Sequence, residues 1–155
     1  MAGPRVFSVD LVVRGYELDQ WGHVNNAVYC NWLEHARWQM GEQLPLFDTR
    51  RHGILPVVRH LSLDYRCETR MHDRLRVSLW PRRAGSTSFV VGGCIRICAV
   101  AGDDDPTGPR VGALALTATM VLACVRRPGG KVALPAEWRP FFPDQDPGDA
   151  VPEDA

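Results

Sequence analysis

Apolar side chains recur with two different periods along this chain. Between residues 7 and 13 every second side chain is apolar, which is the pattern of a half-buried β-strand. Further along, the apolar residues recur every three or four positions and so share one helix face: Tyr29, Trp32, Leu33, Ala36, Met40 and Leu44. Pro45 disfavours helical geometry in the residue before it, and we therefore expect the helix to end there.

After this helix the two-residue period returns. It predicts four more strands, within residues 61–67, 75–79, 89–97 and 111–125. The connections at 71–73, 82–86 and 102–110 are short enough for antiparallel neighbours. One strand, one helix and four strands can bury the helix stripe only if the sheet curls around it. We therefore predict an α+β domain, a five-stranded antiparallel sheet wrapped around one long central helix.

Two details of the strands refine this prediction. Gly92 and Gly93 stand in mid-strand, where they would permit the curvature that such wrapping needs. Apolar residues are also expected on the opposite face of the sheet: Leu114, Leu116, Met120, Leu122 and Val90. They favour an oligomer interface on that face or along a sheet edge.

Length and composition indicate one globular domain. The chain has 155 residues with 18 basic and 18 acidic side chains, and a core of this length folds without disulfides or metal. We assign residues 1–142 to the domain. Residues 143–155 hold five acids, three prolines and no Lys or Arg, so we predict a disordered tail. The first fifteen residues lack the apolar run of a secretory signal, and no apolar stretch reaches the ~20 residues of a membrane span. We therefore expect a cytoplasmic protein with no membrane partner.

Cysteines, histidines and charge exclude several functions. The five cysteines form no CxxC pair and the five histidines show no metal-ligand spacing, so we expect no metal and read the cysteines as buried apolar residues. Without the tail the body carries a net charge of about +5, but no Lys/Arg run exceeds two, and no nucleic-acid partner is expected. This excess would suit a compact anionic ligand, an acidic partner protein or a solvated mixed surface.

Candidate chemistry gathers between the first strand and the helix, in residues 15–37. The first-turn amides of a helix lack intrahelical partners, and the helix dipole adds about half a positive charge there, which suits a carboxylate, a phosphate or an oxyanion. Asp19 precedes this helix start by six or seven residues and could place a carboxylate beside a bound group. Asp19 and Asn25 could equally cap a turn and the helix.

This segment resembles the hotdog-fold thioesterases. The run from Asp19 through Gly22-His23-Val24-Asn25-Asn26 to Tyr29 is similar to the D-x-x-x-H-V-N-N-x-x-Y pattern of the 4-hydroxybenzoyl-CoA thioesterase type and of plastid acyl-ACP thioesterases. It looks closest to the short, single-hotdog acyl-ACP enzymes. The resemblance implies a hotdog domain that hydrolyses an acyl thioester without a cofactor. The substrate would be acyl-CoA or an acyl carrier protein bearing medium-chain, 3-oxoacyl or polyketide groups, and the assembly a homodimer or homotetramer.

The resemblance also implies roles for individual residues. Asp19 would be the nucleophile or the general base, and the Asn26 backbone amide would polarise the thioester carbonyl. His23 and Glu34 match further catalytic positions, although Glu34 is offset by one residue, about 100° on a helix. Substrate contacts are expected at Trp21, which replaces an asparagine of the acyl-ACP enzymes, at Asn25 and at Tyr29.

Other interpretations of the segment stay open. His23 could be a hydrogen-bonded loop histidine, and Glu34 could pair with Arg37 on the helix surface. Tyr29 and Trp32 could belong only to the core. The alternative functions are a hotdog dehydratase or hydratase, and a non-catalytic protein that binds acyl thioesters. Arg50, Arg51, Arg82 and Arg83 fall in predicted loops and would be exposed contacts for an acidic carrier.

Overall fold

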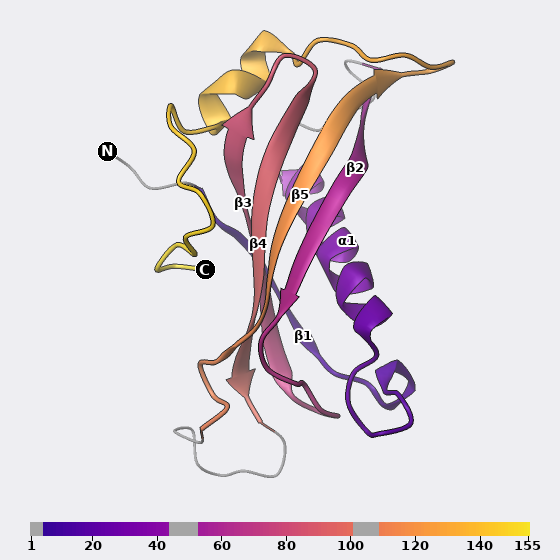
Figure 1. The fold of residues 1–155 in the computed structure, drawn as a ribbon, viewed down its shortest axis with the longest axis vertical. Helices are drawn as coiled ribbons and strands as arrows, with labels where there is room; N and C mark the ends of the chain where they lie inside the picture. Colours follow the sequence, from indigo (N-terminus) through magenta and orange to yellow (C-terminus); the bar gives the residue numbers. More distant parts are fainter. Residues whose placement is uncertain (1–4, 44–52, 101–108) are drawn as a thin grey trace.

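Five strands and one long helix make up the fold (Figure 1). The computed structural model describes residues 5–43, 53–100 and 109–155. In chain order the elements are β1 (Phe7–Val12), η1 (Gly15–Glu17), α1 (Asn26–Gln43), β2 (Ile54–Tyr65), β3 (Arg74–Ala84), β4 (Ser88–Ala99), β5 (Leu114–Arg126) and η3 (Ala136–Phe141). This order of one strand, one helix and four strands confirms the architecture that the two periods predict.

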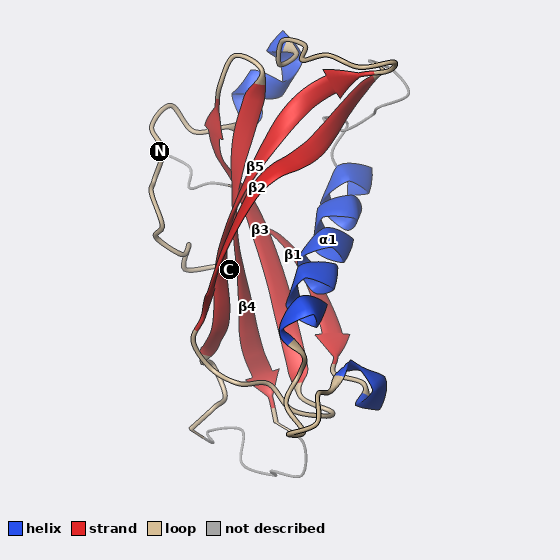
Figure 2. Ribbon diagram, turned by 45° about the vertical axis from the view of Figure 1, so that its right-hand side comes forward, coloured by secondary structure: helices blue, strands red, loops and turns tan. Residues whose placement is uncertain are grey.

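All five strands form one antiparallel sheet in the order β1-β3-β4-β5-β2. The consecutive strands β3, β4 and β5 make its centre, while β1 and β2 are its edges. Figure 2 shows the sheet strongly twisted, with α1 lying along one face. The turn predicted at 71–73 joins the isolated bridge at Arg70 to β3, and His72 takes a positive φ of 67° there.

The helix meets the sheet through the stripe that the sequence predicts. Its buried residues are Tyr29, Trp32, Leu33, Ala36 and Met40, while Leu44 and Pro45 lie outside the described residues. A Cβ on Gly93 would lie 2.8 Å from a methyl of Leu79 and 3.4 Å from a methyl of Leu33. Because glycine has no side chain, it allows β4 and α1 to approach each other closely.

The apolar residues expected on the far face of the sheet mostly lie on the near one. Leu116, Met120 and Leu122 belong to the core cluster around α1, so they do not mark an interface. Leu114 packs on the other face, beside Trp80, and Val90 is buried outside the core cluster, in alternation with its members Phe89 and Val91. The sequence pattern predicted the wrong face because the alternation of inward and outward side chains in β5 changes near the start of this strand. Its register with β4 shifts there, at Ile95/Arg96.

Arg82 and Arg83 do not lie in a loop. Both belong to β3, and Arg82 is only 7% exposed. Pro81 and two arginines resemble a strand end in the sequence, but the register with β4 shifts between Pro81 and Arg83. A bulge tolerates proline because one backbone group there is unpaired. Arg82 is therefore not an exposed contact for a partner, and Arg50 and Arg51 lie outside the described residues.

The predicted disorder of residues 143–155 also differs from the structure. The segment runs along the face of the sheet away from α1 (Figures 1 and 2), and we call it the tail. Arg82 donates to Asp146 and Asp149, Arg96 donates to the Ala155 carbonyl, and Ala155 is buried against Trp80 and Cys94. Composition misses this outcome because a buried arginine of β3, more than sixty residues away in the chain, holds two of the five acids.

Two further observations bear on the sequence expectations. Among the residues that the structure describes, no helix is long and apolar enough to cross a membrane. Cys94 and Cys124 are buried as expected, and burial raises the pKa of each thiol to about 11, whereas Cys98 is exposed.

Candidate active site

The loop before α1 folds back on itself as a small hairpin. Leu18 bridges Val24, and the Asp19 N–H donates to the His23 carbonyl at 2.7 Å. Gly22 sits at the tip with a φ of 78°, a conformation that glycine adopts without steric cost. The hairpin therefore holds Asp19 opposite His23, just ahead of the helix start.

Asp19 is held by backbone groups alone. Its Oδ1 accepts the N–H of Trp21 at 2.9 Å and that of His23 at 3.2 Å. No Lys, Arg or His of the described residues pairs with this carboxylate, and its Oδ2 accepts no hydrogen bond from them. One oxygen thus fixes the orientation of the side chain while the other is available for chemistry.

The start of α1, seven residues after Asp19, offers a backbone donor. Asn25 is the N-cap, since its Oδ1 accepts the Ala27 N–H at 2.9 Å and its carbonyl accepts the Val28 N–H at 2.9 Å. The Asn26 N–H, the first of α1, has no acceptor in the described part of the chain. A first-turn amide with an unused N–H is the donor that an oxyanion needs.

His23 faces a carboxylate of its own. Its Nε2 lies 2.9 Å from an oxygen of Glu68, whose other oxygen accepts from Arg70. The Arg70 hydrogen bond is the main cause that lowers the pKa of the Glu68 carboxyl. The imidazole of His23 therefore faces an ionised Glu68 carboxylate.

The aromatic candidates divide into one exposed and one buried. Trp21 is 73% exposed beside Asp19. Tyr29 is buried, its hydroxyl lies 2.7 Å from that of Thr69, and its ring meets Trp32 and Tyr65 edge to face. Burial raises the pKa of Tyr29, so this phenol stays protonated at neutral pH. Tyr65 in turn donates to the Asn26 carbonyl at 2.9 Å and ties β2 to the helix start.

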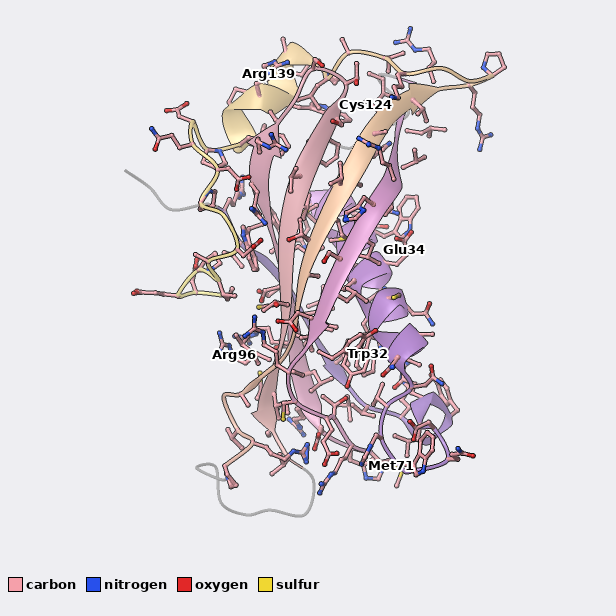
Figure 3. All side chains as sticks on the ribbon, viewed as in Figure 1. Trp32, Glu34, Met71, Arg96, Cys124 and Arg139 are labelled. Atoms are coloured by element: carbon pink, nitrogen blue, oxygen red, sulfur yellow. The ribbon has the colours of Figure 1, made fainter. Side chains whose placement is uncertain are left out.

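Glu34 lies on the exposed side of α1, farther along than Trp32 (Figure 3). It accepts from Arg37 and, at 3.0 Å, from the indole of Trp38. These contacts one turn away are those of a surface helix pair. The structure joins Asp19 to His23 across the hairpin and places Asn26 three residues after His23 at the helix start, but among the described contacts none joins Glu34 to any of them.

Sequence reasoning missed Glu17, which supports the whole hairpin. This carboxylate is 7% exposed, and it accepts the Trp32 indole N–H at 3.0 Å and the Arg14 N–H at 2.7 Å. Its carbonyl also accepts the Asn25 N–H at 2.9 Å. Glu17 stands eight residues before the predicted cap, and nothing in the local sequence distinguishes it from a surface acid.

A family model decides the identity of this fold and site. The thioesterase superfamily model matches residues 21–97, about half of the chain, from the hairpin tip through β4. The chain belongs to the thioesterase superfamily. Asp19 lies two residues before the matched segment, so the match itself does not cover it.

Two curated relatives of this superfamily member are thioesterases. The chain is 40% identical over 67 residues, 43% of its length, to the long-chain acyl-CoA thioesterase FadM of Escherichia coli. It is 37% identical over 71 residues, 44% of its length, to a chloroplastic acyl-acyl carrier protein thioesterase of Arabidopsis thaliana. These matches span 51% and 37% of the two relatives, so the chain spans about half or less of the curated proteins it matches.

Solved thioesterase structures share the fold of this superfamily member over most of its length. The YbaW probable thioesterase from Escherichia coli aligns with a TM-score of 0.73 and 27% identity, covering 87% of this chain and 95% of that one. The 4-hydroxybenzoyl-CoA thioesterase from Pseudomonas sp. strain CBS-3 aligns with a TM-score of 0.74 over 88% and 99% of the two chains. At 16% identity the second likeness shows the fold alone, and that fold is the predicted hotdog.

Within the described ranges no group of three or more His, Cys, Asp or Glu side chains could hold a metal ion.

Proposed function

We propose that this protein hydrolyses acyl thioesters of CoA or of an acyl carrier protein. Two features of the described chain support it together. The Asp19 carboxylate has no cationic partner, and the Asn26 N–H at the start of α1 has no acceptor. Thioester hydrolysis needs both groups, since a nucleophile or base must act while a donor takes up the charge on the carbonyl oxygen.

The proposed hydrolysis follows one of two routes, with Asp19 as general base or as nucleophile. As general base, Asp19 takes a proton from water, the oxygen attacks the carbonyl carbon, and the Asn26 N–H stabilises the oxyanion. The C–S bond then breaks, and the thiolate takes a proton to leave as the free thiol. As nucleophile, Asp19 expels the thiolate to form an acyl anhydride, which water hydrolyses to the acid and the regenerated carboxylate.

The remaining candidates support this chemistry. His23, directed by Glu68, is proposed to bind substrate or water beside Asp19. Trp21 offers an exposed ring beside the carboxylate for the entering arm, while Asn25 fixes the helix start that presents Asn26. Glu34 is proposed to act only if a second copy brings its helix surface toward a site.

An exposed edge of the sheet supports the proposal of a homo-oligomer. The strand β2 is an edge of the sheet, and its exposed apolar side chains are Val57, Val58, Leu61 and Tyr65. Long apolar edge strands pair readily with another strand. We propose a homodimer or homotetramer joined at β2, which light scattering coupled to gel filtration would reveal. For a protein with these substrates we also propose a cytoplasmic location.

The decisive experiment follows thiol release from acyl-CoAs of graded chain length and from acyl carrier protein, by wild type and by Asp19→Asn. The amide retains the Oδ1 that accepts the two loop N–H groups, so the melting temperature should change little, while kcat should fall at least ~100-fold. Asp10→Asn, an exposed carboxylate paired with Arg76 on the sheet, is the matched control. Turnover by Asp19→Asn at nearly the wild-type rate would exclude this mechanism, and binding without turnover by wild type would make the protein a thioester binder.

The salt dependence of the reaction distinguishes acyl carrier protein from CoA as the carrier of the acyl group. An acidic carrier protein would be steered by the positive body of the chain, so kcat/KM on acyl carrier protein should fall as salt rises past ~0.15 M, where the Debye length is ~8 Å. An uncharged acyl-N-acetylcysteamine substrate supplies the baseline. A salt-independent carrier reaction would instead favour acyl-CoA.

A further inference from the structure

The face of the sheet away from α1 holds a hollow of about 150 Å³ beneath the tail. Gly92 forms part of its floor, between Thr119 on β5 and Trp80 on β3. A Cβ at Gly92 would lie 2.5 Å from the indole nitrogen of Trp80, so the ring can lean over the strand only because position 92 is glycine. Hydroxyls of β2 and β5 and the tail at Asp149 close the rest.

The lining is polar, and one of its buried hydrogen-bond donors has no acceptor among the described residues. The buried side chain of Arg82 lines the hollow, and its Nη1 donates to the Thr119 hydroxyl at 3.1 Å. Trp80 is 2% exposed, and its indole N–H has no acceptor among the residues described. Since a buried donor without an acceptor is costly, a ligand oxygen that reached this N–H would recover free energy.

Two tail aspartates contact Arg82 in different ways. Asp146 accepts the Nε–H at 2.9 Å and also the Gly148 N–H at 3.0 Å, and its side chain is 29% exposed. Asp149 accepts the Nη1–H at 2.8 Å, but its side chain is 91% exposed. Asp146 is thus the anchor of the tail, and Asp149 enters the hollow from solvent with a single oxygen.

We propose that this hollow is a binding site for a small oxyanion, a free carboxylate or phosphate, which Asp149 occupies as a tethered competitor. The ligand oxygen replaces Asp149 Oδ1, accepting from Arg82 and from the Thr119 hydroxyl, which itself lies 3.4 Å from that oxygen. Further oxygens meet the hydroxyls of Ser62 and Thr117 and the Trp80 indole.

The charges of the lining fit an exchange of this kind. Arg66 also lines the hollow and is paired with Asp64 at 2.7 Å. With Asp149 displaced, two guanidinium groups face two carboxylates, counting Asp146, so the lining is neutral and an entering anion takes the place of the Asp149 charge. An anion is favoured because a charged oxygen accepts a stronger hydrogen bond from the Arg82 guanidinium than a neutral oxygen does.

Tethering predicts how binding responds to mutation. A carboxylate held three residues from an anchored position competes at an effective concentration of about the mM range. Removing it should therefore strengthen phosphate binding at least ~10-fold, since each charge-assisted hydrogen bond it vacates is worth about that factor. This effect concerns the outer face and is independent of the proposed hydrolysis.

The experiment titrates the full chain with inorganic phosphate and, separately, with acetate at constant ionic strength. It follows calorimetric heat and the NMR resonance of the Trp80 indole N–H. Asp149→Ala is compared with wild type and with Asp154→Ala, an exposed tail acid outside the lining. We expect ~10-fold tighter binding only in Asp149→Ala, with a shift of the Trp80 resonance, and weaker binding when Thr119→Val is added. The preferred anion identifies the source.

Two outcomes would overturn the proposal. One is affinity equal in all three proteins, which would place the ion elsewhere. The other is no saturable binding by Asp149→Ala well above the mM range, which would make the hollow a structural clamp for the tail alone. Asp149 is exposed, so its removal should leave the fold intact, and a melting curve verifies this.

Discussion

The two faces of the sheet use carboxylates in opposite ways. On the α1 side, Asp19 is held by backbone N–H groups and has no cation beside it within the described chain. On the outer side, Asp146 and Asp149 both contact one buried guanidinium, that of Arg82. A carboxylate fixed by backbone dipoles has no counter-ion, whereas the charge of one paired with arginine is compensated by the contact. The first arrangement suits chemistry and the second suits attachment.

The comparison also concerns what supports each carboxylate. The Asp19 hairpin depends on Glu17, buried between Arg14 and Trp32, whereas the tail depends on Arg82. Each support is a buried charged group that holds its partners by hydrogen bonds. Breaking either one should affect its own face and leave the other unchanged, because the sheet separates them.

The largest effect is expected from Glu17→Ala. The change removes the acceptor of the buried Trp32 indole N–H, and an unsatisfied buried donor costs about 1–3 kcal/mol of unfolding free energy. Urea unfolding measures this loss, with Glu42→Ala, an exposed acid at the end of α1, as the control. Amide exchange at the tail should stay unchanged, since Glu17 does not contact it. An unfolding free energy equal to wild type would mean that Glu17 does not support the hairpin.

Arg82→Ala should release the tail at a smaller cost. The two aspartates it leaves reach water, so we expect a loss of about 1–2 kcal/mol together with loss of amide protection over residues 143–155. The neighbouring Arg83→Ala is the matched control, because its guanidinium is exposed and lies 3.8 Å from Asp146. Equal protection of the tail in both variants would contradict the clamp.

How far the sequence predicts each face follows from the range of the interactions. The helix stripe at Trp32 and Met40 follows from spacing, and the Asp19 to Tyr29 motif follows from its pattern, because both are local in the chain. The clamp joins Arg82 to Asp146, 64 residues apart, and no periodicity records such a contact. For the same reason Glu17 looked like a surface acid until the fold placed Trp32 beside it.

Acid should weaken the tail contact by about 1 kcal/mol or less. Partial burial raises the pKa of the Asp146 carboxyl, but hydrogen bonds from Arg82 and Gly148 outweigh it and hold the pKa below the usual 3.8. A lowered folded pKa adds stability that is full above about pH 4 and lost as pH falls through the folded value. Melting curves from pH 6 to 2 should show this loss for wild type and less of it for Asp146→Asn. Identical curves would remove Asp146 from the acid response.

The smallest effect on stability is expected at His23, and this is what makes the variant informative. The contact of His23 with Glu68 is partly exposed on both sides, and such pairs contribute about 0–1 kcal/mol. In His23→Gln the side-chain amide can still donate to Glu68, so urea unfolding should match wild type. Thioester hydrolysis then isolates the role of the imidazole beside Asp19. A fall in kcat with unchanged KM would mean that His23 acts in the transition state, whereas a rise in KM alone would assign it to substrate binding. Unchanged kinetics would return His23 to a loop contact and leave Asp19 and the Asn26 amide as the whole of the proposed chemistry.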